Sequence, residues 1–210
     1  MVKPDYNITV LDINISHQEL TKLPGDINKY TNLKTLKCIN NKLTSLELPP
    51  KLEVLDCTGN KITNLDNLPT TLIKLYCGCN EITGLDNLPP KLKVLHCQYN
   101  GLTSLDNLPP TLEVLYCYNN QITSLDNLPI TLKLLDCTNN KLTNLDNLPQ
   151  TLEILRCIGN NITSLDNLPL KMEVLHCIIN PLKYNFEPTL ENIRNYNASR
   201  NYNASRMLSS

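Results

Sequence analysis

Residues 111–130 read TLEVLYCYNNQITSLDNLPI, and the next twenty residues repeat the pattern as TLKLLDCTNNKLTNLDNLPQ. Leucine, cysteine, asparagine and proline return at the same places in each copy. The same register extends in both directions, so that nine units begin at residues 10, 33, 52, 72, 92, 112, 132, 152 and 172. A fixed period of this length predicts a repeat solenoid, in which each turn buries its apolar face against its neighbours.

The composition excludes several classes of protein. The 210 residues carry a formal net charge of −1 with both signs interspersed, which argues against a nucleic-acid-binding domain. No apolar run approaches the roughly 20 residues of a membrane span, and the first ten residues, MVKPDYNITV, lack the apolar core of a signal peptide. Trp is absent and Phe occurs once, so the core must be aliphatic. We therefore expect an intracellular protein that does not enter membranes.

The unit itself predicts its local structure. Leu115 and Cys117 are two residues apart, which places them on one face of an extended strand. Stacked turns would pair these short strands into a parallel sheet. A recurring asparagine, Asn120 in this unit, would hydrogen-bond the backbone where the chain turns. Pro129 and its equivalents disfavour helix, so the returns should be extended or 3-10 and the solenoid only gently curved.

The unit resembles a leucine-rich repeat, LxxLxLxxNxL, with cysteine in the third apolar position. The resemblance covers residues 10–182 and implies a leucine-rich repeat solenoid over 1–182 with the sheet on its concave side. The short unit and its Leu-Pro-x-x-Leu join are similar to the repeats of secreted effectors of enteric bacteria. The near-identical units, rich in Asn, Lys, Ile and Tyr, also resemble leucine-rich repeat proteins of giant amoeba viruses, which would place the protein in the host cytoplasm.

The C-terminal segment leaves the repeat pattern. In residues 183–194, Leu190 and Ile193 lie on a predicted short helix that would cover the last open turn, as a terminal cap does in solenoids. Residues 195–210 contain a polar duplication, NYNASRNYNASR, without an apolar period. We expect this tail to be disordered.

The nine units align with one another, so positions that vary stand out from the scaffold. On the predicted outward face of the strands, aromatic residues gather on three successive turns. The candidate binding residues are Tyr76, His96, Tyr99, Tyr116 and Tyr118, with Asp136 and Arg156 as flanking polar contacts. Tyrosine supplies rigid, half-polar contact area at protein interfaces, which favours a binding patch. The alternative is cross-strand stacking that only supports the sheet.

Cysteine and aspartate each form a column along the stack. Eight cysteines recur as small apolar core residues, and only Cys79 is predicted near the surface. An aspartate recurs in the returns at 66, 86, 106, 126, 146 and 166. Calcium could bridge such a column, but each carboxylate could equally cap its own turn by accepting backbone N–H groups. The three histidines lie far apart in the repeat register, so we expect no metal site, cofactor or catalytic pair.

These features predict a non-enzymatic, monomeric scaffold that binds a protein partner through the concave sheet, and a host protein is a candidate for that partner. Two alternatives remain open at this point. One is an adaptor for a ubiquitin ligase or another host-directed enzyme supplied by a separate chain, because the similar bacterial effectors include ubiquitin ligases. The other is a passive, expanded repeat array without a dedicated ligand.

Overall fold

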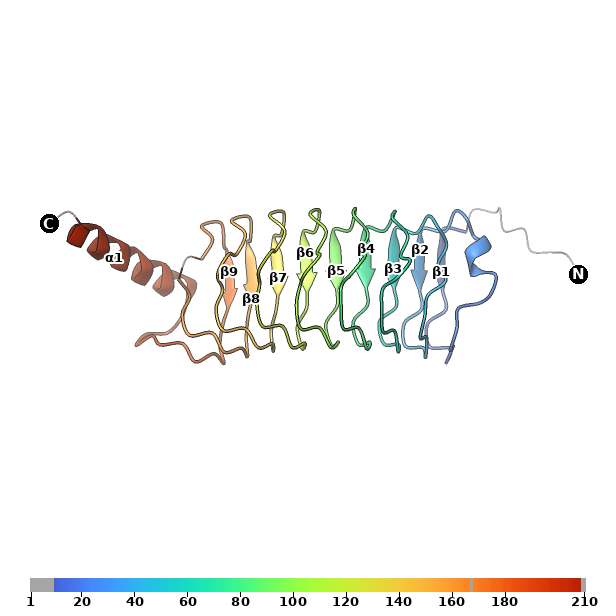
Figure 1. The fold of residues 1–210 in the computed structure, drawn as a ribbon, viewed down its shortest axis with the longest axis horizontal. Helices are drawn as coiled ribbons and strands as arrows, with labels where there is room; N and C mark the ends of the chain where they lie inside the picture. Colours follow the sequence, from blue (N-terminus) through green and yellow to red (C-terminus); the bar gives the residue numbers. More distant parts are fainter. Residues whose placement is uncertain (1–9, 167, 209–210) are drawn as a thin grey trace, which may run out of the picture.

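A single parallel sheet runs the length of the protein (Figure 1). The computed structural model describes residues 10–166 and 168–208, with side chains through residue 200. Within them, nine strands pair in chain order. They are β1 (Asp12–Asn14), β2 (Thr35–Lys37), β3 (Val54–Asp56), β4 (Lys74–Tyr76), β5 (Val94–His96), β6 (Val114–Tyr116), β7 (Leu134–Asp136), β8 (Ile154–Arg156) and β9 (Val174–His176). One strand per turn confirms the predicted solenoid of about nine repeats.

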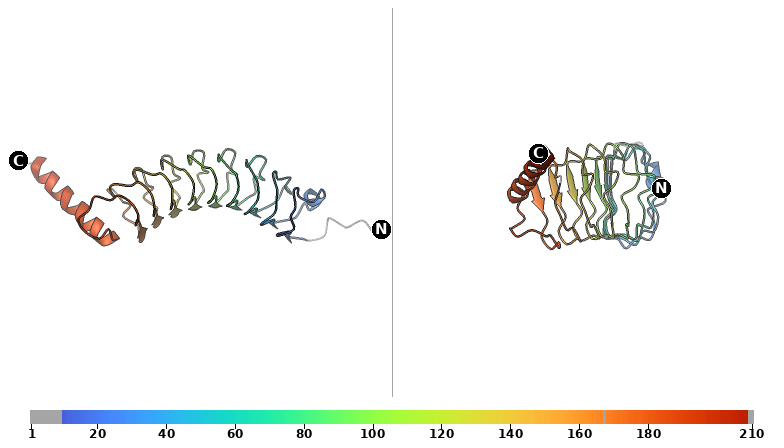
Figure 2. Two further views of the ribbon diagram at one scale, coloured as in Figure 1. Left: turned by 90° about the horizontal axis from the view of Figure 1, so that it is seen from below. Right: turned by 60° about the vertical axis from the view of Figure 1, so that its left-hand side comes forward.

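The stack bends into a shallow arc, with the strands on its inner side (Figure 2). The returns on the outer side are extended and joined by turns. Within the described residues, the 3-10 helix η1 (Ile27–Lys29) lies in the longer return of the first unit. After the recurring Leu-Pro joins, the chain forms short turns, in which, for example, the Leu112 N–H donates to the Pro109 carbonyl at 3.1 Å. The gentle curvature follows because inner and outer sides are both extended chain with similar layer spacing.

The core is one continuous aliphatic column. Strands β2 to β8 each contribute a fully buried central leucine, such as Leu115, whereas the central residues of β1 and β9, Ile13 and Leu175, are only partly buried. The eight column cysteines (Cys38, Cys57, Cys77, Cys97, Cys117, Cys137, Cys157 and Cys177) are buried free thiols, as predicted, and Cys79 is exposed. Several of these thiols point at the next turn, for example Cys57 Sγ, 3.4 Å from the Tyr76 carbonyl oxygen. Cysteine therefore fits a narrow column where larger apolar residues would not.

In each repeat after the first, the side chain of a recurring asparagine forms hydrogen bonds with the backbone of its own turn and of the preceding turn. The side-chain amide of Asn120 donates to the carbonyls of Cys97, at 3.1 Å, and Cys117, at 3.0 Å. Its Oδ1 accepts the N–H of Leu102 from the preceding turn at 3.0 Å. Asn140 repeats these contacts one turn later. The side chain thus satisfies three buried backbone groups that lie at the corner where the strand ends.

Two further positions are held in the left-handed backbone region. In the returns, Asn67, Asn87, Asn107, Asn127 and Asn147 have φ between 59° and 63°. The second position follows each strand, and its occupants are Asn40, Gly59, Cys79, Tyr99, Asn119, Asn139, Gly159 and Ile179, with φ between 51° and 71°. Asparagine and glycine tolerate this conformation best, which explains why they recur. Cysteine, tyrosine and isoleucine at the second position are therefore exceptions.

The C-terminal helix α1 (Leu190–Leu208) caps the last turn and extends away from the stack (Figure 1). The Thr189 hydroxyl accepts the Asn192 N–H at 3.2 Å, as a helix N-cap does. Ile193 is fully buried against the core, as the predicted cap requires.

The prediction of a disordered tail from residue 195 is wrong as far as Leu208, because the backbone there is helical. The polar composition did not indicate that side chains of this helix pack against the end of the repeat stack. Tyr196 packs on Tyr184 and Phe186 with ring centroids 5.3 and 5.4 Å apart, and Asn197 Nδ2 donates to the Leu165 carbonyl at 3.0 Å. Packing of this kind, more than propensity, stabilises helices in proteins. The predicted solenoid start at residue 1 and the last two tail residues lie outside the described residues.

Asn120→Ala should lower the free energy of unfolding in urea by about 1–3 kcal/mol. The change leaves one N–H and two carbonyl groups without their side-chain partner at a site that is only 9% exposed. Gln121→Ala is the matched control, because Gln121 is the exposed neighbour and its side chain accepts a hydrogen bond from Lys141 on the next turn. It should change stability by less than about 0.5 kcal/mol. Equal effects for both variants would contradict the role of the asparagine column.

Thiol labelling should separate Cys79 from the column. Burial raises the pKa of Cys38 and Cys97 to about 12, so these thiols are neither accessible nor ionised at neutral pH. In the native protein, mass spectrometry should show rapid modification of Cys79, followed by Cys177 at the end of the stack, while all nine cysteines react in denaturant. Rapid labelling of several interior cysteines in the folded protein would contradict the inward orientation of the column.

Candidate partner-binding face

The concave face is built from the two outward positions that flank each buried central leucine. The first is mostly aliphatic, as at Val94, Val114 and Leu134, and these side chains are partly exposed. The second differs from turn to turn. Parallel pairing brings its occupants into one row, because Tyr76 pairs with His96, His96 with Tyr116, and Tyr116 with Asp136. The sheet therefore displays a variable row of side chains on an invariant scaffold.

Three aromatic side chains of this row are in contact. The rings of Tyr76 and His96 have centroids 4.7 Å apart in an edge-on arrangement, and those of His96 and Tyr116 lie 4.4 Å apart. All three are partly buried. Rings in such contact add about 0.5–1.5 kcal/mol per pair beyond the area they bury, so the row also supports the sheet. The structure thus brings together the residues predicted for the patch, and the stacking alternative describes part of their contacts.

A second aromatic pair lies beside this row, just past the strands. Tyr99 and Tyr118 meet edge-on with centroids 5.4 Å apart, and Tyr99 is 53% exposed. Burial raises the pKa of the Tyr118 hydroxyl, with a smaller contribution from Tyr99. Tyr99 occupies the left-handed position with φ of 53°, where five of the other turns have asparagine or glycine. This conformation costs a tyrosine on the order of 1–2 kcal/mol. An exposed aromatic side chain at a costly position is typical of a functional surface.

Asp136 and Arg156 contact each other within the sheet, and Asp136 is less accessible to a partner than the sequence suggests. Asp136 is buried, and its Oδ1 accepts the Thr138 N–H at 3.2 Å. Its Oδ2 lies 4.0 Å from Arg156 Nη1 on the next strand. The pair therefore closes the C-terminal side of the aromatic row with largely compensated charge, and Arg156 is the more exposed partner.

His96 is the titratable group at the centre of the row. It lies between Tyr76 on β4 and Tyr116 on β6 and is half-buried. Burial lowers the pKa of its imidazole below the ordinary value of 6.5, and the negative charge of Asp56 opposes that shift. The imidazole is therefore neutral at physiological pH, and so is the middle of the patch.

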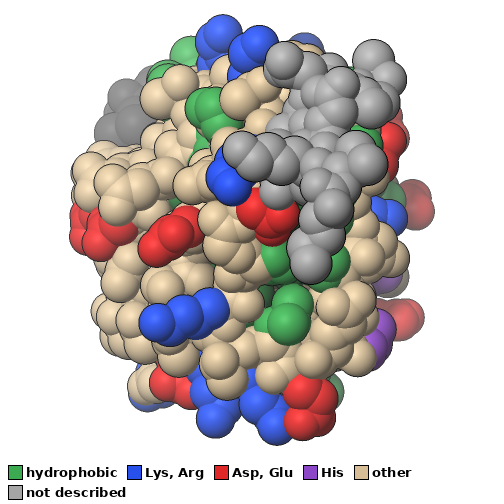
Figure 3. Space-filling view, turned by 90° about the vertical axis from the view of Figure 1, so that its right-hand side faces the viewer, with side chains coloured by type: hydrophobic (Ala, Val, Ile, Leu, Met, Phe, Trp, Pro, Cys, Tyr) green, Lys and Arg blue, Asp and Glu red, His purple; other side chains and the backbone are tan. Residues whose placement is uncertain are grey.

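Charges at the edges of the sheet alternate and are paired. Glu113 lies 3.0 Å from both Lys93 and Lys133 on the neighbouring turns. The two lysines lower the pKa of Glu113. Seen from the N-terminal end, basic and acidic side chains are interspersed (Figure 3). Such exposed pairs contribute little to stability, about 0.2–1 kcal/mol each.

Several aspartates of the column in the returns make hydrogen bonds or ion pairs. Asn107 Nδ2 donates to Asp86 Oδ1 at 3.0 Å, and Arg200 lies 3.1 Å from Asp166. In two turns the bonding runs opposite to the predicted capping, because the backbone N–H of the aspartate donates to the asparagine two residues before it, at 3.1–3.2 Å. In the described part of the chain, no three His, Cys, Asp or Glu side chains lie close enough to share a metal ion.

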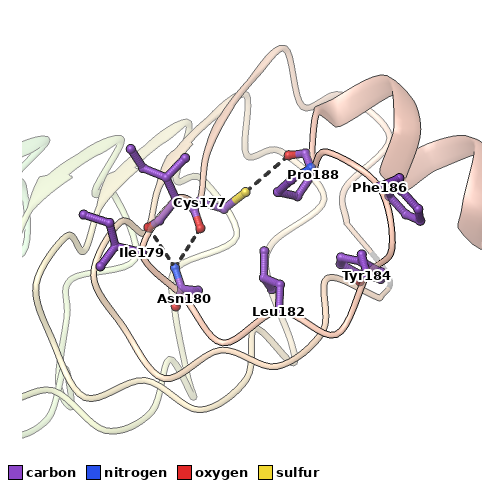
Figure 4. A pocket seen from close by; sticks show the side chains of 8 residues that line it. Cys177, Ile179, Asn180, Leu182, Tyr184, Phe186 and Pro188 are labelled. Carbon is purple, nitrogen blue, oxygen red and sulfur yellow. Dashed lines mark hydrogen bonds between the residues drawn. The ribbon is translucent and has the colours of Figure 1, made fainter.

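The sequence did not identify a cavity at the C-terminal end of the stack (Figure 4). It has a volume of about 290 Å³ and lies between the last turn and the loop before α1. Its lining residues are Cys177, Ile178, Ile179, Asn180, Leu182, Tyr184, Phe186 and Pro188. Ile178 and Ile179 are 61% and 76% exposed, and Ile179 has φ of 59°. One feature of the sequence could have indicated this site, because Ile179 stands at a position where most other turns have asparagine or glycine.

Across residues 10–166 and 168–208, no helix combines the length and apolar character needed to cross a bilayer.

Comparisons with known proteins agree with this architecture. Residues 90–130 match the family described as Leucine Rich repeats (2 copies). The fold is similar to YopM from Yersinia enterocolitica WA-314, with a TM-score of 0.73 and 35% identity, over 78% of this chain and 36% of that one. It is also similar to the functional domain of InlJ from Listeria monocytogenes, which includes a cysteine ladder (TM-score 0.72, 38% identity, 82% of this chain and 40% of that one).

A Shigella effector LRR domain is similar over 89% of this chain and 76% of its own length, with a TM-score of 0.64 and 29% identity. The present chain spans well under half the length of YopM and of the InlJ domain. No curated protein sequence matches it significantly. The chain therefore has the leucine-rich repeat fold and resembles bacterial leucine-rich repeat effectors.

The pKa of His96, followed by NMR of its ring protons, should lie below 6.5, and Asp56→Asn should lower it further by removing the charge that favours imidazolium. Asp66→Asn makes the same charge change in an exposed return and should leave the pKa of His96 unchanged. Because the pKa is lower in the folded than in the unfolded chain, the contribution of His96 to stability should fall as the pH drops below about 6.5. A pKa above 6.5 would contradict the half-buried, neutral imidazole.

Proposed function

We propose that this leucine-rich repeat protein is a non-enzymatic scaffold that binds another protein through its concave sheet face. The observation that carries the proposal is Tyr99, an exposed tyrosine at a left-handed position whose ring contacts that of Tyr118. A scaffold without a ligand would gain stability from asparagine or glycine there. Tyrosine is also among the residues that contribute most to binding at protein interfaces.

The proposed contact surface consists of Tyr76, His96, Tyr99, Tyr116 and Tyr118, flanked by Asp136 and Arg156. The similar Shigella domain belongs to an effector, which favours a role in contacting a protein of another cell. We extend the proposal to a monomer that acts inside a host cell, in its cytoplasm, and binds a host protein. The near-identical, Asn- and Lys-rich repeats favour a giant amoeba virus as the source. An adaptor that presents the partner to an enzyme on another chain would use the same face.

The test is a double substitution, Tyr116→Ala with Tyr118→Ala, followed by quantitative capture of partners from cells that express the protein. Partner capture should fall at least about tenfold, which corresponds to about 1.4 kcal/mol. The fold should survive, because the buried leucine and asparagine columns are unchanged. Loss of two ring contacts should lower Tm by less than about 10 °C.

Thr123→Ala with Ser124→Ala is the control, because both residues are exposed on the return of the same turn. Asn127, on the same return, is not part of the control, because its φ of 63° would strain an alanine. The control pair should leave capture unchanged. Loss of capture in the control with full capture by the tyrosine variant would place binding on the convex face, and capture of no partner by any form would favour the passive array.

A further inference from the structure

The charged side chains around the aromatic patch are few and mostly compensated. On the outward positions of strands β3 to β7, the charged residues are Asp56, Lys74 and Asp136. Asp136 is buried against Arg156 and the Thr138 N–H. Asp56 Oδ1 accepts the Thr58 N–H at 3.2 Å. Lys74 is exposed to solvent on β4, in register with Val94 on β5.

Between these residues, the centre of the face is uncharged. It consists of the aliphatic side chains of Val94 and Val114, the contacting rings of Tyr76, His96 and Tyr116, and the polar but neutral Gln98. A partner charge buried there would lose its hydration without meeting an opposite charge, which costs several kcal/mol. An uncharged segment would lose little hydration energy and would gain contact area with the rings.

We propose that the partner segment lying over Tyr76, His96 and Tyr116 is uncharged and that it binds the neutral form of His96 in preference to the charged form. This inference rests on the proposed function and adds the chemistry of the partner. The bound segment covers the exposed half of the imidazole and supplies no carboxylate to stabilise its charged form. The neutral form is therefore favoured more strongly in the complex than in the free protein.

The direction in which pH affects partner binding follows from thermodynamic linkage between that binding and the protonation of His96. The groups facing His96 are the two tyrosine rings from β4 and β6, with Asp56 on β3 as the charge that acts on it. As the pH falls through the pKa of His96, the imidazole becomes charged in the free protein, and binding should weaken.

The first experiment selects ligands of defined chemistry. A phage library of random twelve-residue peptides is depleted on the Tyr116→Ala, Tyr118→Ala variant and then selected on the full chain at pH 7.5. Enriched peptides should have uncharged residues, aromatic or amide-bearing, at their recurrent positions. Recurrent Asp or Glu, attracted by Lys74, or recurrent Lys or Arg, attracted by Asp56, would overturn this inference and leave the concave binding face standing. No enrichment on the wild type over the variant would overturn the proposed function as well.

The second experiment measures how peptide binding depends on the protonation of His96. For an enriched peptide carrying a fluorophore, Kd from anisotropy should rise at least about threefold between pH 7.5 and 5.5. His96→Gln, which is neutral throughout, should reduce that ratio to less than about 1.5. His176→Gln, on the exposed end strand β9, should keep the wild-type ratio. Tighter binding at pH 5.5, or an unchanged pH dependence in His96→Gln, would overturn the coupling.

Discussion

The recurring asparagine is the interaction on which the rest of the structure depends. Each turn contains only three residues of strand, far too few to be stable alone. Backbone pairing joins the turns along the concave side, but the chain must then leave the sheet while still buried. Asn120 and its equivalents supply the missing partners at this corner and connect consecutive turns in the same step. Because the backbone groups at this corner are hydrogen-bonded, leucine and cysteine can fill the interior without leaving polar groups unpaired.

The same scaffold explains why binding can evolve on the concave face at low cost to the fold. The central leucine of strands β2 to β8 is buried, whereas its two neighbours point away from the core. Substitutions at these neighbours change the surface and leave the columns intact. The left-handed position after each strand is different, because its backbone conformation penalises most side chains. Tyr99 and Ile179 both depart from the rule, and both stand next to candidate surfaces, the aromatic patch and the C-terminal cavity.

Much of the candidate face was predictable because the repeats act as their own alignment. The rows of Tyr76, His96 and Tyr116 and of Tyr99 and Tyr118 follow directly from the repeat register, since parallel pairing places equivalent residues side by side. Their degree of burial was not predictable in the same way. Asp136 was expected as a flanking contact, yet it is buried and bonded to Thr138, because its neighbours on adjacent strands cover it.

The sequence by itself determined the solenoid, the number of its turns, the inward cysteine and asparagine columns and the paired charges at the sheet edge. Each of these depends only on the period and on contacts between equivalent positions. The tertiary structure decided what has no repeat to define it: the helix through Leu208 and the cavity at the C-terminal end of the stack. Both depend on packing between residues that are not equivalent in the repeat, such as Tyr196 on Tyr184.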